Sequence, residues 1–466
     1  MANVNDPTRA GDIKRFQVFK AEHNSKKFVD FSAACVEFSY YEDILSNSVT
    51  ATATIVESGL ADSKSVEYKG ALDNLPIRGG EPVNLIIQDN QVKPTQLKFA
   101  GRSDNEFYVN RIRGVDPGTQ KDVYFIDLCS RELLTNEQVR VVKRYDGKIS
   151  NNVKKILTES LGCDAKKSKQ GLMTQKSVEV DDTAENYNFI GNDRKPFYVC
   201  TWLASKSIPS LSVNGKNTLG SAAGYFFYET YEGFKFKSID KLLEGKVIKK
   251  YIFTNTPELP KNYDAKILSV DIEKDMDLQQ NLTMGAYSNR TIFFDSVDFV
   301  YEVRDWGIDK TKDGVVSAGK KTLGDGVSPE FTSSPSRIMS RVRDIGALPS
   351  GNTAVEQLED SDSTDHGTPT FDSENTMVQS AMRYNQLFSI KTSVTIAGDF
   401  SLRAGQVIYC DFSQLSVDSN KVTNKETGGK YLIVSVCHRM TPEDCYSRLT
   451  LVRDTFGRVS APGNLL

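Results

Sequence analysis

The chain has 466 residues, of which 39% are hydrophobic and 10% aromatic, a composition typical of a globular protein with roughly two to four domains. Its 58 basic and 61 acidic residues leave a formal charge of −3, which argues against nucleic acid or a membrane surface as the main partner. The first residues lack a basic-then-apolar signal, and no run approaches the roughly 20 apolar residues of a membrane span, so we expect no membrane insertion by this chain.

Residues 16–131 are predicted to be rich in strands. Between residues 49 and 55, valine, alanine and isoleucine alternate with threonine, which is the period-two pattern of a half-buried strand. Residues 83–87 and 107–112 continue this pattern, with turn residues at 79–80. We expect this block to be a β-barrel or a sandwich.

Helical patterns follow the strands. Four apolar residues have helical spacing and precede Gly162, a favourable C-terminal cap: Val153, Ile156, Leu157 and Leu161. Pro196 is expected to open a second helix over residues 197–204, which must end near Pro209.

An aromatic hairpin is predicted next. Residues 224–230 and 234–237 face each other across Glu232 and Gly233. Because residues 225–228 are apolar on both faces, we expect this strand to be covered on both sides.

The segment that follows is predicted to mix helices, strands and irregular chain. Residues 275–284 are expected to form a short helix ended by Gly285, and residues 292–294 and 297–303 to form strands. Residues 307–370, with an acidic stretch at 356–365, are rich in Gly, Ser, Asp and Lys, and we predict an exposed excursion with one short helix around 337–345. Asp372 and Ser373 are expected to cap a helix through Asn385 that leads into strands from Ile390.

One pattern occurs near both ends of the chain at a constant spacing. Residues 77–83 read IRGGEPV and residues 402–408 read LRAGQVI, so that Gly405 follows Gly80 by 325 positions. The same spacing separates Val109 from Val434 and Pro117 from Pro442. Each copy places an Arg-x-Gly turn before a strand and a long hairpin. Two short segments of biased composition can match by chance. If the match is not due to chance, the chain contains two copies of a small barrel separated by a large insertion.

Few residues point to metal binding. The three histidines, His23, His366 and His438, stand in a polar turn, an acidic loop and a strand. His438 follows Cys437, but neighbours in a strand point to opposite faces and cannot share one ion in regular geometry. The simpler interpretation is a buried cysteine beside a histidine on a surface or interface.

Other candidate motifs also have simpler explanations. Residues 427–430 resemble a phosphate loop, but Asn424 and Tyr431 occupy positions that require Gly and Ser or Thr, so we predict a hairpin turn. Asp295 and Asp305 could form the carboxylate pair of a glycosidase, although no second motif supports this, and we expect turn or strand-end residues. The basic residues 166–169 are expected to be a solvated loop.

We therefore predict no catalytic, cofactor-binding or metal-binding residue, and a protein that is not an enzyme. Trp202 is expected to pack in a core. The seven cysteines are scattered and odd in number, which indicates reduced, mostly buried thiols and synthesis in a cytoplasm: Cys35, Cys129, Cys163, Cys200, Cys410, Cys437 and Cys445.

The central segments carry a resemblance to a known family. Residues 196–208 combine a Pro-Phe start with the run from Trp202 to Ile208, and residues 224–230 and 233–240 form the aromatic hairpin. Residues 284–288, 294–295 and 398–406 add to the likeness. In this order, over roughly residues 28–456, the chain resembles the baseplate central hub protein of T-even-like contractile-tailed bacteriophages.

The resemblance implies an α+β, mostly β fold in which two antiparallel barrels related to the tail-tube protein carry inserted α/β domains. It divides the chain into a first tube-like barrel (1–131), an inserted helical or α+β domain (132–208), an aromatic hairpin segment joining the second barrel (209–245), an inserted α+β domain that contains the excursion 307–370 (246–371), and a second tube-like barrel (372–466). The excursion and the loop at 413–430 are departures from the family.

The family's hub is a structural homotrimer that continues the hexameric tail tube, carries the cell-puncturing spike and encloses a channel for DNA. The resemblance therefore implies as partners the spike protein, tail-tube or tube-initiator proteins, and the tape-measure and wedge proteins, with DNA only in passage. It places the chain in the tail baseplate of a virion, after synthesis in the host cytoplasm.

Two alternatives remain open. One is the hub of a related contractile injection system, a tailocin or the base of a secretion spike, whose spike is often fused to the same chain. The stop at Leu466, soon after the second barrel, favours a separate spike and therefore a phage. The other is a baseplate cell-wall hydrolase, for which the sequence offers no paired acid and nucleophile.

Overall fold

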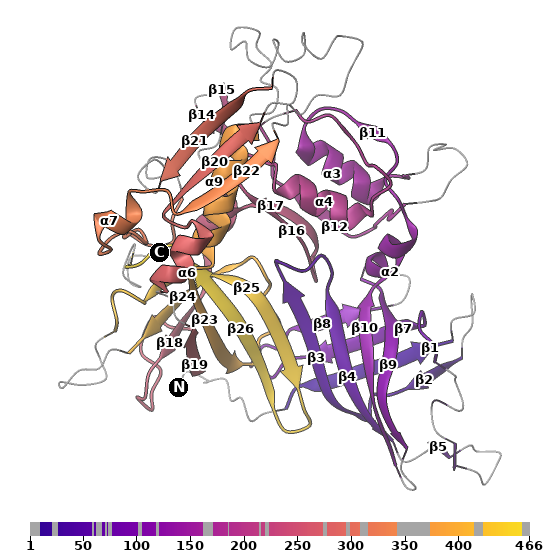
Figure 1. Cartoon of the computed structure of the whole chain (residues 1–466). Coiled ribbons are helices and arrows are strands. Elements are labelled where there is room, and N and C mark those ends of the chain that lie inside the picture. Colours follow the sequence, from indigo (N-terminus) through magenta and orange to yellow (C-terminus); the bar gives the residue numbers. More distant parts are fainter. Residues whose placement is uncertain are drawn as a thin grey trace.

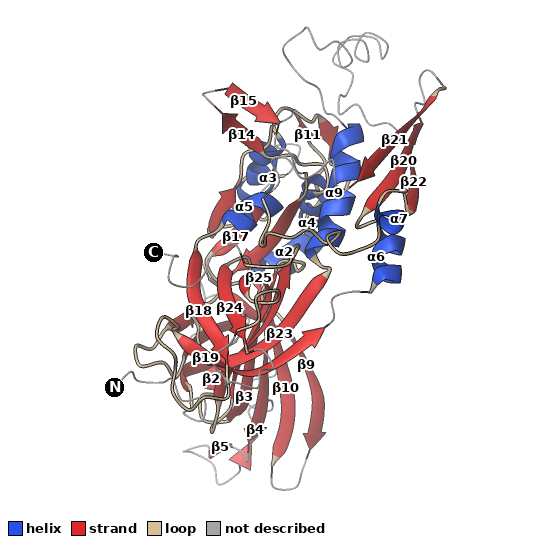
Figure 2. Cartoon of the chain, turned by 90° about the vertical axis from the view of Figure 1, so that its left-hand side faces the viewer, coloured by secondary structure: helices blue, strands red, loops and turns tan. Residues whose placement is uncertain are grey.

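The computed structural model describes residues 10–20, 27–57, 60–61, 68–69, 72, 77–100, 105–117, 121–161, 171–184, 186–213, 216–219, 223–273, 277–294, 299–307, 316–342, 373–413 and 423–458. Most of its regular structure is β-strand (Figure 1). Two strand-rich parts lie side by side in the lower half of Figure 1, and most of the helices lie above them (Figures 1 and 2).

The N-terminal sheet has the strand order β2-β1-β7-β9-β10-β4-β3, with β8 also paired to β7. Its strands are β1 (Asp12–Phe19), β2 (Phe28–Asp30), β3 (Cys35–Asp43), β4 (Thr50–Glu57), β7 (Pro82–Gln88), β8 (Gln96–Phe99), β9 (Phe107–Pro117) and β10 (Asp122–Ser130). The alternation predicted for residues 49–55 is present in β4, whose alanines and isoleucine are buried while its threonines are half-buried. One buried cluster, which includes Phe16, Tyr40 and Tyr124, fills the curved inner face of this sheet.

The C-terminal part is a closed six-stranded barrel, since β25 pairs with both β24 and β26 in the cycle β25-β24-β18-β19-β23-β26. Its strands are β18 (Val247–Phe253), β19 (Ala265–Glu273), β23 (Ile390–Ala397), β24 (Val407–Phe412), β25 (Gly429–Met440) and β26 (Cys445–Arg453). The barrel is mixed, because β18 runs parallel to β24 and to β19.

An inserted α+β unit follows β10. It contains α2 (Arg131–Gln138), β11 (Arg144–Tyr145), α3 (Ile149–Thr158), β12 (Ser177–Val180), β13 (Phe189–Ile190), α4 (Pro196–Ala204), β14 (Ser210–Val213), β15 (Lys216–Leu219), β16 (Tyr225–Thr230), β17 (Gly233–Ser238) and α5 (Ile239–Glu244). The aromatic hairpin is β16–β17, and every residue of β16 is buried, as its apolar sequence predicted. Alternate residues of β16 pack in two different clusters: Tyr225 and Phe227 against α3 and α4, Phe226 and Tyr228 against the C-terminal barrel.

A small three-stranded sheet, β21-β20-β22, packs beside the long helix α9 (Ser373–Leu387) (Figure 2). Its strands are β20 (Ser288–Phe294), β21 (Tyr301–Gly307) and β22 (Arg337–Val342), with α6 (Leu278–Met284) and α7 (Pro329–Thr332) nearby. Helix α6 ends at Gly285 in the left-handed conformation, as predicted. Among the described residues, no helix is long and apolar enough to cross a membrane.

The two strand-rich parts repeat one strand order. In chain order, β1, β3, β4, β7, β9 and β10 of the N-terminal sheet correspond to β18, β19, β23, β24, β25 and β26 of the barrel. In both sets the first strand pairs with the fourth, the fourth with the fifth, the fifth with the sixth, the sixth with the third and the third with the second. The first strand differs, since β1 is antiparallel to β7 whereas β18 is parallel to β24.

The Arg-x-Gly turns of the two parts share two hydrogen bonds. The Arg78 amide donates to the side chain of Glu81 (2.8 Å), and the Arg403 amide donates to the side chain of Gln406 (2.8 Å). The two turn glycines have similar positive φ angles, 87° at Gly80 and 83° at Gly405. The Gly80 amide donates to the carbonyl of Val109 (2.7 Å), and the Gly405 amide donates to the carbonyl of Ile433 (2.8 Å). The structural offset is therefore 325 at the turns and 324 between β9 and β25, where the sequence pattern indicated 325.

Two β-bulges also recur. The β9–β10 ladder skips Asn110 between Val109 and Arg111, and the β25–β26 ladder skips Val434 between Ile433 and Ser435. The β3–β4 ladder skips Val36, and the β19–β23 ladder skips Leu268. Because bulges sit at specific places in a fold, this agreement indicates a structural duplication rather than a chance match of two turns.

The expectation of two closed barrels is not met within the described residues. Only the C-terminal part closes; in the N-terminal part β1 and β3 do not pair, and the edge of β3 instead pairs with β25 of the barrel. The strands β18 and β19 belong to the barrel although they fall in the range 246–371 that was assigned to an inserted domain. Helix α3 ends at Thr158, before the predicted stop at Gly162, which lies outside the described residues.

The described part of the excursion 307–370 is more ordered than its polarity predicted. Within its described part, residues 316–342, the expected helix around 337–345 is wrong: Arg337–Val342 is strand β22, paired in parallel with β20. Ala318 and Leu323 are buried, and the Ala318 amide donates to Asp454 (2.9 Å). Pairing with an existing strand and burial of these few apolar side chains order a segment that has little helical pattern of its own. The acidic stretch 356–365 lies outside the described residues.

Candidate functional site: buried polar contacts between the sheets

The residues considered as catalytic or metal-binding candidates are not brought together. Asp305 forms an ion pair with Arg290 (2.6 Å), while Asp295, His23, His366, Cys163 and residues 166–169 lie outside the described residues. Residues 427–430 lead into β25, and Arg453 donates to the Thr427 carbonyl (3.1 Å), as fits a hairpin turn. Trp202 packs on Tyr187 and Phe189. No cluster of three potential metal ligands occurs in the part of the chain that the structure describes.

The interpretation of Cys437 and His438 was wrong in its assignment of burial. His438 is fully buried, whereas Cys437 is half-buried. His438 stacks on Tyr40 of β3, with ring centroids 6.1 Å apart, and its Nδ1 lies 2.8 Å from the Ser447 hydroxyl. Burial and the neighbouring Arg403 lower the pKa of His438 to about 3. The imidazole is therefore a neutral core group at the contact between the two sheets.

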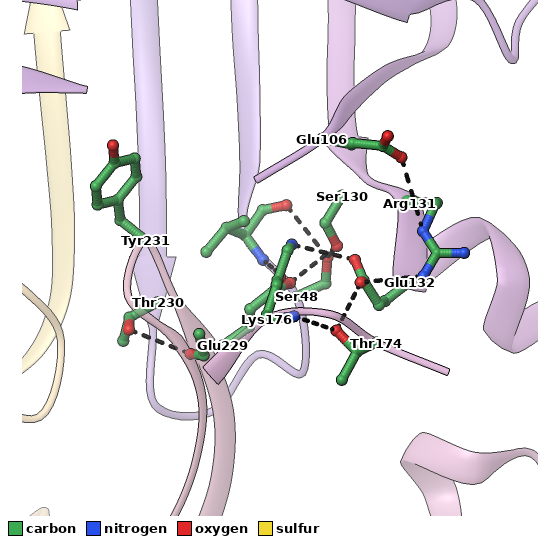
Figure 3. A network of polar contacts seen from close by, with 12 residues as sticks. Ser48, Glu106, Ser130, Arg131, Glu132, Thr174, Lys176, Glu229, Thr230 and Tyr231 are labelled. Atoms are coloured by element: carbon green, nitrogen blue, oxygen red, sulfur yellow. Dashed lines mark hydrogen bonds and ion pairs between the residues drawn. The ribbon is translucent and has the colours of Figure 1, made fainter. Parts of the chain in front are cut away.

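The most elaborate polar site surrounds Glu229 of β16, where the inserted unit meets the N-terminal sheet (Figure 3). One oxygen of this buried carboxylate accepts hydrogen bonds from the Val49 amide (3.0 Å) and the Ser130 hydroxyl (2.9 Å). Its other oxygen pairs with the ammonium of Lys176. Glu229 thus connects β16 to the start of β4 and the end of β10.

A second carboxylate shares the same lysine. Lys176 lies 3.1 Å from Glu132, which stands in the first turn of α2 and also accepts a hydrogen bond from the Thr174 hydroxyl (2.8 Å). Arg131, at the rim, lies 3.5 Å from Glu132 and 3.7 Å from Glu106 (Figure 3). Burial raises the pKa of Glu229, against the opposing effect of Lys176. Burial alone would lower the pKa of Lys176, but Glu229 and Glu132 together raise it, so the ammonium stays charged.

Glu42 of β3 forms a second buried connection, here between three parts of the chain. One oxygen accepts hydrogen bonds from the Tyr231 amide (2.8 Å) and the Tyr40 hydroxyl (2.9 Å), and the other accepts from the Ala404 amide (3.0 Å). Arg403 lies 3.8 Å away and stacks over the ring of Tyr231 (4.9 Å). Glu42 therefore holds the hairpin turn and the barrel's Arg-x-Gly turn against the N-terminal sheet.

A cleft of about 370 Å³ lies between the β16–β17 hairpin and the turn at Gly405. Its charged side chains largely pair with one another: Lys235 with Glu179 and Glu232, and Lys237 with Glu179 and Asp181. This arrangement stiffens the hairpin; it does not present a reactive group. Chemically, all three sites hold elements together.

The sequence analysis missed Glu229 and Glu42. The signal that could have found Glu229 is a single acidic residue inside an apolar strand, Tyr228-Glu229-Thr230, whereas Glu42 shares its strand with Glu37 and Asp43 and does not stand out. A charged side chain is almost never fully buried unless it is paired, so such a residue predicts a buried partner. Nothing in the sequence indicates which partner, because Lys176 and Arg403 are far away along the chain.

Comparison with known proteins gave no matching family model and no matching curated protein. Solved structures are similar over nearly the whole chain. A tail protein from Neisseria meningitidis MC58 is 9% identical, with 96% of this chain and 97% of that chain covered and a TM-score of 0.46. The 43 kDa tail protein of prophage MuSo2 from Shewanella oneidensis is also 9% identical, with 95% and 100% covered and a TM-score of 0.47. The E. coli c3393 protein, a component of the type VI secretion system, is 9% identical, with 97% and 80% covered and a TM-score of 0.36.

Proposed function

We propose that this chain is the structural hub of a contractile phage tail baseplate: a homotrimer that joins the hexameric tail tube to a trimeric cell-puncturing spike and leaves a central channel for DNA. In this proposal the chain is a non-enzymatic component of the virion. Its partners are the spike protein and tail-tube or tube-initiator proteins, with tape-measure and wedge proteins at the periphery.

The observation that carries the proposal is the duplicated strand order. Two similar sheets in one chain become six similar positions when three chains form a closed ring. Such a ring offers equivalent contacts to a hexameric tube on one face. The inserted elements, which occur once per chain, are present three times and match a threefold spike. One duplicated chain can thus connect a sixfold to a threefold assembly without a catalytic residue.

The buried polar contacts support this role. Glu229 and Glu42 hold the two sheets and the inserted hairpin against one another with charged hydrogen bonds. Breaking one partner of a buried ion pair typically costs about 3–5 kcal/mol, so these contacts strongly favour one relative arrangement of the parts. A ring adaptor needs such a fixed arrangement, because an error in the angle between its two sheets would prevent closure.

The mass and shape of the purified full-length protein test the proposal. Native mass spectrometry should give three chains, and negative-stain class averages should show a ring with six similar lobes. A protein that stays monomeric at all concentrations, or a ring without threefold symmetry, would overturn it. A peptidoglycan-release assay on the same sample tests the hydrolase alternative, since cleavage by this chain alone would favour a hydrolase over a structural hub.

A further inference from the structure

The duplication defines which strand edges of the two sheets are equivalent. Through the aligned ladders and their bulges, β3 corresponds to β19 with Tyr41 matching Glu273, and β9 corresponds to β25 with Arg113 matching Cys437. Within the chain, β3 pairs with β25 in an antiparallel register that sets Tyr41 opposite Cys437 and Tyr40 opposite His438. One contact between the two sheets is therefore already made inside each chain.

The equivalent edges at the other ends of the two sheets are unpaired within the described residues. One edge of β25 pairs with β24 over the first part of the strand and with β3 over the second part. The equivalent edge of β9 pairs with β7 only at Phe107 and Tyr108. The edge of β19 that is equivalent to the β25-facing edge of β3 pairs with β18 only at Ala265 and Lys266. Within the described residues, the later part of β9 therefore has an unpaired edge equivalent to the one by which β25 contacts β3. The later part of β19 has an unpaired edge equivalent to the one by which β3 contacts β25.

The side chains on these edges differ in burial from their counterparts. Tyr40 and His438, at the centre of the β3–β25 contact, are both 0% exposed. Their counterparts are Ile272 on β19, which is 47% exposed, and the bulged segment at Gly114 and Val115 on β9, where Val115 is 50% exposed. A partner strand on either edge would cover these exposed apolar residues.

We propose that β9 of one copy pairs antiparallel with β19 of a neighbouring copy, in the register of the β3–β25 contact. The proposal rests on the ring assembly proposed above and assigns its subunit interface. The register places Arg113 opposite Glu273 and Asp116 opposite Asp271 of the neighbour, with Val115 beside Ile272. Because the two edges differ, the interface is head-to-tail, and repeated rotation closes it into a ring instead of a two-fold dimer.

The charged side chains contribute little to the attraction between the two edges. Arg113 is already paired with Asp127 of its own chain (3.0 Å), and Asp116 and Asp271 repel, so the charges do not favour the contact. Backbone hydrogen bonds along the two open edges and the cover of Val115 and Ile272 must therefore provide most of the attraction.

Cysteine cross-linking of the full-length chain tests the register. The double variant Arg113→Cys/Glu273→Cys should give covalently joined dimers and trimers on a non-reducing gel after mild oxidation. The matched control Arg113→Cys/Ser269→Cys displaces the second cysteine by four residues on the same strand and should give at least tenfold less. Equal cross-linking of both, or of neither, would overturn the assignment.

Matched surface variants test the edges without cross-linking. Val115→Asp and Ile272→Asp should each lower the trimer fraction in native mass spectrometry more than tenfold while the circular dichroism spectrum stays unchanged. Val92→Asp and Ile248→Asp, at residues of similar exposure (54% and 43%), should leave the trimer intact. A trimer that survives both edge variants would exclude this interface but leave the hub proposal in place, whereas a wild-type monomer would remove the hub proposal itself.

Discussion

The two Arg-x-Gly turns share the positive φ of their last glycine but have opposite surroundings, and they differ at the middle residue, where Gly79 has a positive φ (105°) and Ala404 does not. Arg78, Gly79 and Gly80 are exposed or half-buried, whereas Arg403 and Ala404 are buried under Glu42 and the hairpin turn. Two hydrogen bonds are common to the turns, but the Gly79 amide donates to Glu81 within its own turn (2.9 Å), whereas the Ala404 amide donates to Glu42 of β3 (3.0 Å). What differs is the partner, and the stability of each copy should depend on that partner alone.

The largest expected effect separates the two arginines. Arg403→Met removes the cation nearest to the buried carboxylate of Glu42 and should cost about 3–5 kcal/mol in the free energy of unfolding. Arg78→Met, the same change in the exposed turn, should stay within about 0.5 kcal/mol. Urea denaturation of both variants measures the difference. Similar losses would mean that the second turn gains nothing from its burial.

The aromatic hairpin should give an effect of similar size. Phe227 is 4% exposed and stacks on Phe234 and Phe197, so Phe227→Ala should cost about 3–5 kcal/mol and lower the soluble yield. Tyr198→Ala, on the exposed side of α4 at 55% exposure, is the control and should cost less than about 1 kcal/mol. Unchanged thermal melting of Phe227→Ala would contradict the packing of β16 between two clusters.

The two turn glycines sharpen the comparison. Both have positive φ, so an alanine at either should cost roughly 1–2 kcal/mol through the backbone. A Cβ at Gly405 would also lie 2.0 Å from the Tyr228 hydroxyl, whereas a Cβ at Gly80 would meet nothing within 4 Å. Gly405→Ala should therefore lose about 1–3 kcal/mol more than Gly80→Ala. Calorimetric melting of the pair should show this order, and the reverse order would contradict the close contact at Gly405.

An effect of comparable size depends on pH. Because His438 has a pKa of about 3 in the folded protein and an ordinary value of 6.5, the unfolded chain binds a proton first as the pH falls. The stabilisation from His438 is complete above pH 6.5 and is lost as the pH approaches 3. At about pH 4.5 the loss should be roughly 2–3 kcal/mol. In His438→Gln the decline in stability between pH 6.5 and 4.5 should be shallower by this amount; equal slopes would place the imidazole in contact with solvent.

The sequence predicted local structure well and distant contacts poorly. Apolar patterns were sufficient for β4, β16, α4 and the cap at Gly285, because each depends on neighbours within one turn or strand. The 325-residue spacing indicated the duplication, which the turn geometry and the strand order bear out. The open N-terminal sheet was not foreseen, since strand closure depends on the relative positions of β1, β3 and β25 in space. Likewise, β22 depends on β20 more than on its own residues.

The β3–β25 pairing determines how late in synthesis the fold can be completed. Ser435 pairs with Asp43, so 392 positions of chain must be made after β3 before its edge is covered. At roughly 5–20 residues per second, this edge stays open for about 20–80 s during synthesis. Through that interval, the backbone N–H and C=O groups along this edge are open to any nascent chain nearby. A truncated product that lacks β25 would keep this edge, so polysomes that make this chain should require a chaperone at β3 long before any subunit can join a ring.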